Sequence, residues 1–290
     1  MKILILGSNG QLGKSLQKIF HNNYEIWFSS KKEIDISKFK DTEKSILRFK
    51  PNIIINASAY TAVDNAEKNP EQAFLVNHES VNNLAKICFK INCLLIHIST
   101  DYVFDGKSNI PYLENDITNP MSIYGKSKLF GENSIIESGC KYIIIRTAWV
   151  FSEYESNFLK TMLKLSKNKS LKIVDDQIGC PTYVHDLAKV IFTISNRYNT
   201  LRNYKKIYHF CGNESVTWFD FAQMIFKIDS EDNDESKNPE LYKINSSELN
   251  YLAERPKYSI LNSQKIYDDY GVVPTKLHIA IQNCIEKIDL

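Results

Sequence analysis

The stretch KILILGSNGQLGKSLQKIF (residues 2–20) decides the fold. Lys2–Leu6 is a short apolar run that predicts a strand, and the residues after the turn predict a helix to about Phe20. Gly7, Gly10 and Gly13 lie in the turn: the first allows the tight bend, the second lets backbone approach a pyrophosphate, and the third lets the helix pack on the sheet. The positive end of the helix dipole then faces the phosphates. We therefore predict a dinucleotide site. The spacing is G-x-x-G-x-x-G and not the G-x-G-x-x-G of many dehydrogenases, so an ordinary glycine-rich turn is the alternative.

Short apolar runs alternate with helix-length amphipathic segments through the first half of the chain. Predicted strands are 2–6, 25–28, 53–56, 94–99 and 142–147, and predicted helices include 38–50, 70–91 and 122–137. This alternation predicts an α/β fold, a Rossmann-type doubly wound parallel sheet with a smaller C-terminal α/β substrate lobe. We expect residues 1–150 to form the NAD(P)-binding domain, with later segments returning to it, and residues 151–290 to be mainly the substrate lobe. The charge-dense stretch 229–240 predicts a solvated loop.

Composition excludes several classes of protein. The 36 Lys and Arg nearly balance the 34 Asp and Glu, so nothing favours a nucleic-acid partner. No apolar run approaches the roughly 20 residues of a membrane span, and the N-terminus begins a strand without a signal leader. The six cysteines are scattered without metal-ligand spacing. We expect a cytoplasmic protein with reduced thiols, no bound metal and no membrane partner.

The second predicted strand ends in Phe28-Ser29-Ser30-Lys31, without an acid to grip the adenosine ribose. Hydroxyls and a cation tolerate a 2′-phosphate, so NADPH is favoured, with NADH as the alternative. Asp35 can accept from the adenine amino group or cap the following helix. Residues 56–61 (NASAYT) leave the third strand with small side chains, which fits backbone running along a cofactor.

Tyr124 and Lys128, four residues apart, place a phenol and an ammonium on one helix face, about two dozen residues after Thr100 at a strand end. Phenol is a weak acid with a pKa of about 10. A cation about 4 Å away is worth roughly 4 kcal/mol to the phenolate at an effective dielectric of about 20, and desolvation opposes it. The pattern predicts a proton-delivery site, although Y-x-x-x-K alone also arises by chance in a chain rich in Tyr and Lys.

Together these segments resemble the extended short-chain dehydrogenase/reductase superfamily, and more narrowly the dTDP-4-dehydrorhamnose reductase family. The resemblance spans almost the whole chain in family order. It is carried by GSNGQLG (7–13), NASAYTAVDNAE (56–67), STDYVFDG (99–106), PMSIYGKSKLFGE (120–132), RTAWVF (146–151), DDQIGCPTY (175–183) and RP (255–256).

The resemblance implies reduction of the 4-keto group of dTDP-4-dehydro-L-rhamnose, with Thr100, Tyr124 and Lys128 as catalytic residues. Tyr124 would protonate the alkoxide, Lys128 would bind the nicotinamide ribose and lower the tyrosine pKa, and Thr100 would bond the tyrosine or the ketone. The implied cofactor contacts are Gly7, Gly10, Gln11, Leu12, Gly13, Asp35, Ile36, Ala57, Ala59, Tyr60, Thr61, Ser99, Tyr124 and Lys128. The implied substrate contacts are Val63, Asp64, Thr100, Asp101, Trp149 and Arg255. Trp149 as plain core, Thr100 bonded only to backbone and Arg255 as a surface turn residue remain alternatives.

One departure concerns the Mg²⁺ that some family members bind at a dimer interface through two glutamates. Ser15 and His185 stand at those positions, so we expect no such metal and a monomer or weak homodimer. A related dehydratase would carry glutamate where Tyr102 stands, and an epimerase/reductase needs a Cys/His pair that no motif provides. The remaining alternatives are a non-catalytic NADP-binding regulatory subunit, resembling the methionine adenosyltransferase β subunit, and a reductase of another nucleotide-linked keto sugar.

Overall fold

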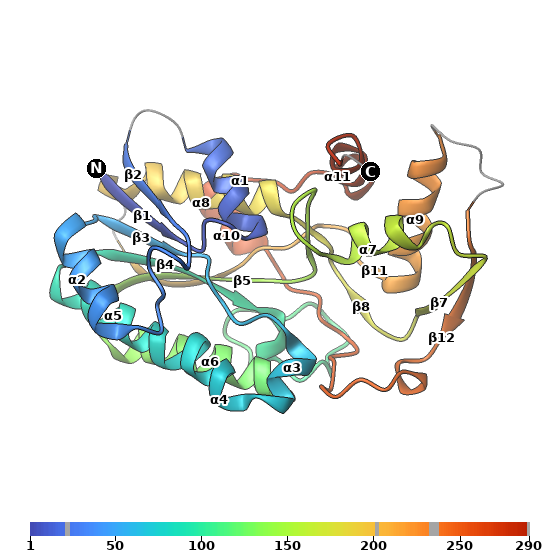
Figure 1. Ribbon diagram of the computed structural model, residues 1–290, viewed down its shortest axis with the longest axis horizontal. Helices are drawn as coiled ribbons and strands as arrows, with labels where there is room; N and C mark the ends of the chain where they lie inside the picture. Colours follow the sequence, from blue (N-terminus) through green and yellow to red (C-terminus); the bar gives the residue numbers. More distant parts are fainter. Residues whose placement is uncertain (21–23, 201–202, 232–237, 289–290) are drawn as a thin grey trace.

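A six-stranded parallel sheet forms the centre of the computed structural model, which describes residues 1–20, 24–200, 203–231 and 238–288 (Figure 1). Its order is β10-β5-β4-β3-β1-β2, and every pairing is parallel. The strands are β1 (Lys2–Leu6), β2 (Glu25–Ser29), β3 (Ile53–Asn56), β4 (Leu94–Thr100), β5 (Lys141–Thr147) and β10 (Lys205–His209). The predicted doubly wound sheet is confirmed. The chain reverses direction across the sheet between β1 and β3, and ligands of such sheets bind at the carboxyl ends beside this point.

Helices cover both faces of the sheet, as Figure 1 shows. Ile3 and Ile5 of β1 pack in one cluster with α1 (Gln11–Ile19), α8 (Val184–Asn196) and α10 (Gln264–Tyr270). Leu4 and Leu6 pack on the other face with α2 (Phe39–Phe49), α5 (Ser80–Lys90) and α6 (Ile123–Glu137). Successive side chains of a strand point to opposite faces, so a strand buried on both faces is apolar throughout.

The helix predicted over 70–91 forms with one irregular turn. α4 (Pro70–Phe74) runs into a π-helical turn, η1 (Leu75–Glu79), which continues into α5. Single π-helical turns often occur at functional sites. Here the turn carries the buried Asn77, which the regular apolar pattern gave no reason to single out.

The C-terminal lobe is a smaller α/β unit with its own apolar cluster, drawn on the right of Figure 1. Three helices of the lobe pack beside a parallel pair of strands. The helices are α7 (Phe158–Leu165), α9 (Trp218–Glu231) and α11 (Leu277–Ile285), and the strands are β7 (Ser170–Val174) and β12 (Glu240–Ile244). Two pairs of short strands lead into the lobe: β6 (Val150–Phe151) pairs with β9 (Thr182–Tyr183), and β8 (Ile178–Gly179) pairs with β11 (Val216–Thr217).

The predicted boundary near residue 150 stays a prediction, although α8 and β10 return to the first half of the molecule. The stretch predicted as a loop differs at its edges, since α9 includes Asp229 and β12 begins at Glu240; residues 232–237 lie outside the described residues. Within the described ranges, no helix has the length and apolar character needed to cross a bilayer.

Candidate active site

The glycine turn follows β1 at the carboxyl end of the sheet. Gly7 has a φ of +80°, and a Cβ there would lie 2.8 Å from the Ser58 nitrogen, so both conformation and space demand glycine. Gly13 is equally constrained, because a Cβ would lie 2.3 Å from the Gly7 carbonyl oxygen. At Gly10 the nearest atom to a Cβ is 3.5 Å away, an ordinary contact. Protein packing therefore does not explain Gly10, and its approach to a cofactor phosphate stays a prediction.

Other predicted cofactor residues surround this turn. α1 begins after Gly10 without a side-chain cap, which leaves the first-turn amides of Gln11 to Gly13 for an anion. The Gln11 side chain accepts from Ser152 Oγ at 2.7 Å and Asn157 Nδ2 at 3.0 Å. Leu12 packs in the core.

Asp35 follows β2 and stabilises a turn. Its Oδ1 accepts from Ser37 N at 3.1 Å and Ser37 Oγ at 2.7 Å, while Lys38 is the residue preceding α2. Asp35 is therefore not the N-cap of that helix, and its contact with adenine remains a prediction. Ile36 is buried beside it.

The segment 57–61 after β3 is held by Asn77 of the π-helical turn. Asn77 Oδ1 accepts from Tyr60 N at 2.8 Å, and its Nδ2 donates to Tyr60 O and Ser127 Oγ, both at 3.0 Å. Ala57, Ala59 and Tyr60 are partly buried and Thr61 is exposed. Sequence reasoning placed this segment along the cofactor but missed Asn77, which links it to α6.

Thr100 and Tyr124 come together where β4 ends and α6 begins. Tyr124 lies in the first turn of α6, which Ser122 caps by accepting from Gly125 N at 3.1 Å. Its ring contacts that of Tyr102 edge to face, with centroids 5.5 Å apart. Burial raises the pKa of Tyr124 to about 12, and a hydrogen bond with Thr100 opposes that rise.

Lys128, one turn further along α6, is almost fully buried, and its Nζ donates to the Ile98 carbonyl oxygen at 2.6 Å. Burial lowers the pKa of Lys128 to about 8. The predicted lowering of the tyrosine pKa is wrong for this structure, in which burial raises it. Desolvation dominates at Tyr124, and Lys128 Nζ is directed at the Ile98 carbonyl oxygen of β4, so Lys128 does not offset the burial of the phenol.

Polar atoms without partners collect at the ends of β4 and β5. Among the described residues, Ser99 Oγ, Asp101 Oδ2 and Thr147 Oγ1 are buried and make no hydrogen bond. Asp101 Oδ1 accepts from Thr100 Oγ1 at 2.9 Å, and burial raises the pKa of Asp101 to about 7. Buried polar atoms are nearly always paired in folded proteins, so these atoms are suited to a polar ligand.

Trp149 lies two residues after the end of β5 and has a φ of +47°, an uncommon conformation for a bulky residue. Its ring stacks on Trp218 at 3.5 Å with the planes 5° apart, and Trp218 Nε1 donates to Gln177 Oε1 at 3.1 Å. Gly179 leaves the space that the Trp149 ring fills, because a Cβ there would come within 2.5 Å of it. Trp149 is partly exposed, and Trp218 is a partner that the motif segments did not include.

Two predicted substrate contacts bind each other. Arg255 Nη2 donates to Asp64 Oδ2 at 2.7 Å, and the Asp64 Oδ1 accepts from the backbone amides of Leu252 and Ala253, both at 3.1 Å. Arg255 also lies over the Tyr251 ring, 4.1 Å from its centroid. The pair fixes the loop before Pro256 against α3 (Val63–Lys68), beside a cavity of about 620 Å³ that Arg255 lines. Val63 begins α3 and is partly buried.

Ser15 and His185, which stand where the resemblance implies metal ligands in some family members, form a hydrogen-bonded row with Glu153. Ser15 Oγ lies 2.7 Å from His185 Nδ1, and His185 Nε2 lies 3.0 Å from both Glu153 oxygens. In the described part of the chain, no three His, Cys, Asp or Glu residues are grouped as metal ligands.

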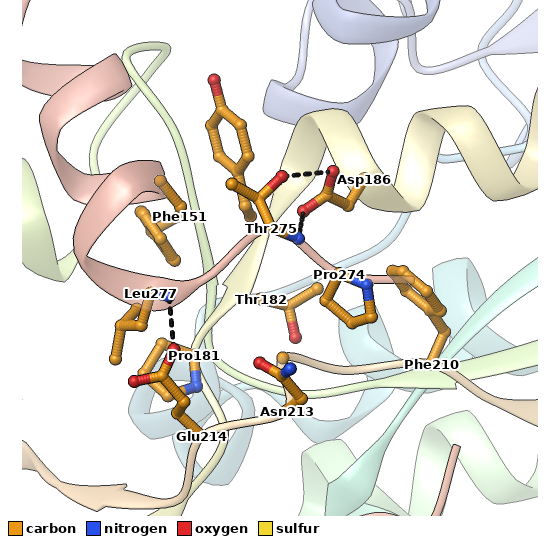
Figure 2. Close-up of a pocket in the computed structure, with 13 residues that line it drawn as sticks. Phe151, Pro181, Thr182, Asp186, Phe210, Asn213, Glu214, Pro274, Thr275 and Leu277 are labelled. Carbon is orange, nitrogen blue, oxygen red and sulfur yellow. Dashed lines mark hydrogen bonds between the residues drawn. The ribbon is translucent and has the colours of Figure 1, made fainter. Parts of the chain in front are cut away.

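A separate small pocket lies between the sheet and the lobe (Figure 2). Two of its acidic side chains are already paired: Asp186 accepts from Thr275 N at 2.7 Å and Oγ1 at 2.9 Å, and Glu214 accepts from Leu277 N at 2.7 Å. The volume is about 10 Å³, close to that of one water. It is too small for a nucleotide sugar.

Comparisons with known proteins agree with this geometry. The model of the RmlD substrate binding domain family matches residues 1–290. The dTDP-4-dehydrorhamnose reductase of Aggregatibacter actinomycetemcomitans is 42% identical over 287 residues, covering 97% of each chain. The chain belongs to the dTDP-4-dehydrorhamnose reductase family.

Solved structures of this family share the fold. A dTDP-4-dehydrorhamnose reductase from Clostridium acetobutylicum is 35% identical with a TM-score of 0.90, covering 99% of each chain. One from Bacillus anthracis in complex with NADP is 33% identical with a TM-score of 0.90 and the same coverage. The predicted family and its reductase class are confirmed, whereas the roles of individual residues stay predictions.

Proposed function

We propose that this chain reduces the 4-keto group of dTDP-4-dehydro-L-rhamnose with NADPH, giving dTDP-L-rhamnose. The observation that carries the proposal is the position of Thr100, Tyr124 and Lys128 at the end of β4 and the start of α6, on the same carboxyl edge of the sheet as the glycine turn, in a chain of this family. When bound, the reduced nicotinamide supplies the hydride. The chain's own residues position the ketone, exclude water and deliver the proton.

Tyr124 serves as the acid in this mechanism. Its pKa of about 12 keeps the phenol protonated at neutral pH, so a proton is held ready for the alkoxide that forms at C4. Thr100 bonds the phenol and orients it toward the ketone oxygen. The ammonium of Lys128 holds the nicotinamide ribose, and its charge stabilises the phenolate left after transfer.

The two parts of the molecule divide the remaining work. Residues 1–150 bind the dinucleotide through the glycine turn, Asp35, Ile36, the 57–61 segment and Ser99. The nucleotide sugar binds to residues of the lobe and its border, together with Val63, Asp64, Asp101, Trp149 and Arg255. Ser30 donates to Glu33 through both N and Oγ at 2.8 Å, so an acid does stand near the end of β2, and NADH remains the alternative cofactor.

We also infer a cytoplasmic enzyme that needs no Mg²⁺ and works as a monomer or weak homodimer. The Ser15, His185 and Glu153 side chains engage one another where other members place metal ligands, which supports this inference.

The decisive assay is consumption of NADPH by purified protein supplied with dTDP-6-deoxy-4-keto-L-mannose. We expect turnover with this sugar and none without it, and an NADH series run in parallel sets the cofactor preference. Turnover only with another nucleotide-linked keto sugar would reassign the substrate. Cofactor binding without turnover on any keto sugar would favour the regulatory-subunit alternative.

A further inference from the structure

Lys128 is connected to a buried row of polar side chains that the proposed mechanism does not use. Asn56 ends β3, His97 pairs with it in register on β4, and Lys128 faces His97 from α6. Asn56 Nδ2 lies 3.1 Å from His97 Nδ1, and His97 Nε2 lies 3.3 Å from Lys128 Nζ. Asn56 and His97 are fully buried and Lys128 is 1% exposed, so water cannot replace these partners.

The direction of these hydrogen bonds is fixed from the Asn56 end. Ser58 donates to Asn56 Oδ1 through its backbone N–H at 3.2 Å, which identifies that atom as the oxygen of the amide. The Asn56 amide nitrogen then points at His97 Nδ1, which must accept. A neutral imidazole that accepts at Nδ1 carries its proton on Nε2. This N–H is directed at Lys128 Nζ.

We propose that His97 is a positioning residue for Lys128: by presenting a donor rather than an acceptor, it favours the neutral amine before the cofactor binds. A neutral amine has two N–H groups and one lone pair, which match the Ile98 carbonyl oxygen at 2.6 Å and the His97 Nε2–H. An ammonium has no lone pair to accept from His97. Binding of the ribose hydroxyls, which can accept from an ammonium, would therefore bring a proton to Lys128. The inference rests on the proposed role of Lys128 toward the cofactor.

Other charged and titratable groups near Lys128 are engaged elsewhere. Glu132, one turn on along α6, binds Arg146 of β5 at 2.7 Å. Asp101 at the end of β4 accepts from Thr100 at 2.9 Å. Tyr124, one turn earlier on α6, is protonated because burial raises its pKa to about 12. Burial lowers the pKa of His97 well below its ordinary value, which agrees with a neutral ring.

The tautomer can be read directly by nuclear magnetic resonance of cofactor-free protein with ¹⁵N-labelled histidine rings. His97→Gln removes one ring's signals from the spectrum and so assigns His97 among the six histidines of the chain. We expect a neutral ring protonated at Nε2. Protonation at Nδ1, or a doubly protonated ring at neutral pH, would overturn the inference without any reference to catalysis.

Asn56→Asp reverses the direction of the row, because a carboxylate accepts from Nδ1–H and leaves Nε2 to accept from an ammonium. The ring should switch to the Nδ1–H form, and the alkaline limit of NADPH affinity should move up by roughly one pH unit or more. His97→Gln is the matched control, since its amide can accept from Asn56 and donate to Lys128, and its alkaline limit should stay in place. An unmoved limit in Asn56→Asp, despite a switched tautomer, would refute the link to Lys128. Loss of turnover with the Nε2–H tautomer intact would instead count against the proposed function.

Discussion

Replacement of Tyr124 by phenylalanine isolates one proton in the proposed reaction. The hydroxyl is lost, while the ring and its edge-to-face contact with Tyr102, at 5.5 Å, are kept. Burial raises the pKa of Tyr124 from 10.0 to about 12, which corresponds to roughly 3 kcal/mol against the phenolate. At neutral pH the phenol is therefore protonated in nearly every molecule, and its removal takes away the proton donor.

We expect Tyr124→Phe to lower kcat by roughly 10²–10⁴-fold, which is the usual contribution of a positioned acid. This corresponds to about 3–5 kcal/mol of transition-state stabilisation. The dissociation constant for NADPH should change little, because the phenol does not hold the phosphates. Steady-state consumption of NADPH measures the first quantity, and fluorescence titration of the cofactor measures the second.

Tyr204→Phe is the matched control, because it removes a hydroxyl that donates to Tyr198 O at 3.0 Å beside β10. Its kcat should equal that of the wild type. Wild-type turnover in Tyr124→Phe, or a loss confined to cofactor affinity, would refute the assignment of Tyr124 as the acid.

Three further substitutions test the electrostatics of the site. Burial lowers the pKa of Lys128 to about 8, so the buried ammonium destabilises the fold below that pH, and this loss of folding stability fades toward pH 10. Lys128→Met should therefore be inactive, yet up to roughly 3 kcal/mol more stable than the wild type in urea unfolding at pH 7. Burial raises the pKa of Asp101 to about 7, so the ionised carboxylate destabilises the fold above pH 7. Asp101→Asn should be up to roughly 4 kcal/mol more stable than the wild type above pH 7, and this difference should disappear as pH falls toward 4. A difference that does not change with pH would contradict this. Glu132→Gln leaves the buried Arg146 without a compensating negative charge and should lower the free energy of unfolding by about 3–5 kcal/mol. Glu43→Gln, in an exposed pair with Lys90, should change it by less than about 1 kcal/mol, and equal effects would mean that the buried pair contributes no more than an exposed one.

Sequence reasoning found the sheet because its central strands β1, β3, β4 and β5 are buried on both faces and form mostly apolar runs. It missed the helices α10 and α11. It also missed the two-residue strands of the lobe, which are too short to show an alternation of apolar and polar residues. The π-helical turn at Leu75–Glu79 was also missed, because one extra residue in a turn does not disturb an apolar pattern enough to be read.

At the site, the residues that follow strands were placed together correctly, since parallel strands bring their carboxyl ends to one edge. The direction of the Lys128 side chain was not predictable, because its nearest partners, Ile98 O and His97, lie on another element. The balance between desolvation and charge at Tyr124 depends on burial, which a spacing of four residues cannot supply. Asp64 and Arg255 were named separately, and their pairing across 191 positions needed coordinates.

The position of β10 at the edge of the sheet bears on how the protein is made. Residues Lys205–His209 complete the sheet beside β5, and α8 packs on α1, so the nucleotide-binding half is unfinished until more than two thirds of the chain has left the ribosome. A fragment ending near residue 150 would expose the β5 edge and the apolar face of α1, and such surfaces invite aggregation. Any split or fused version of this enzyme should therefore be cut beyond β10, and never at the apparent border between its halves.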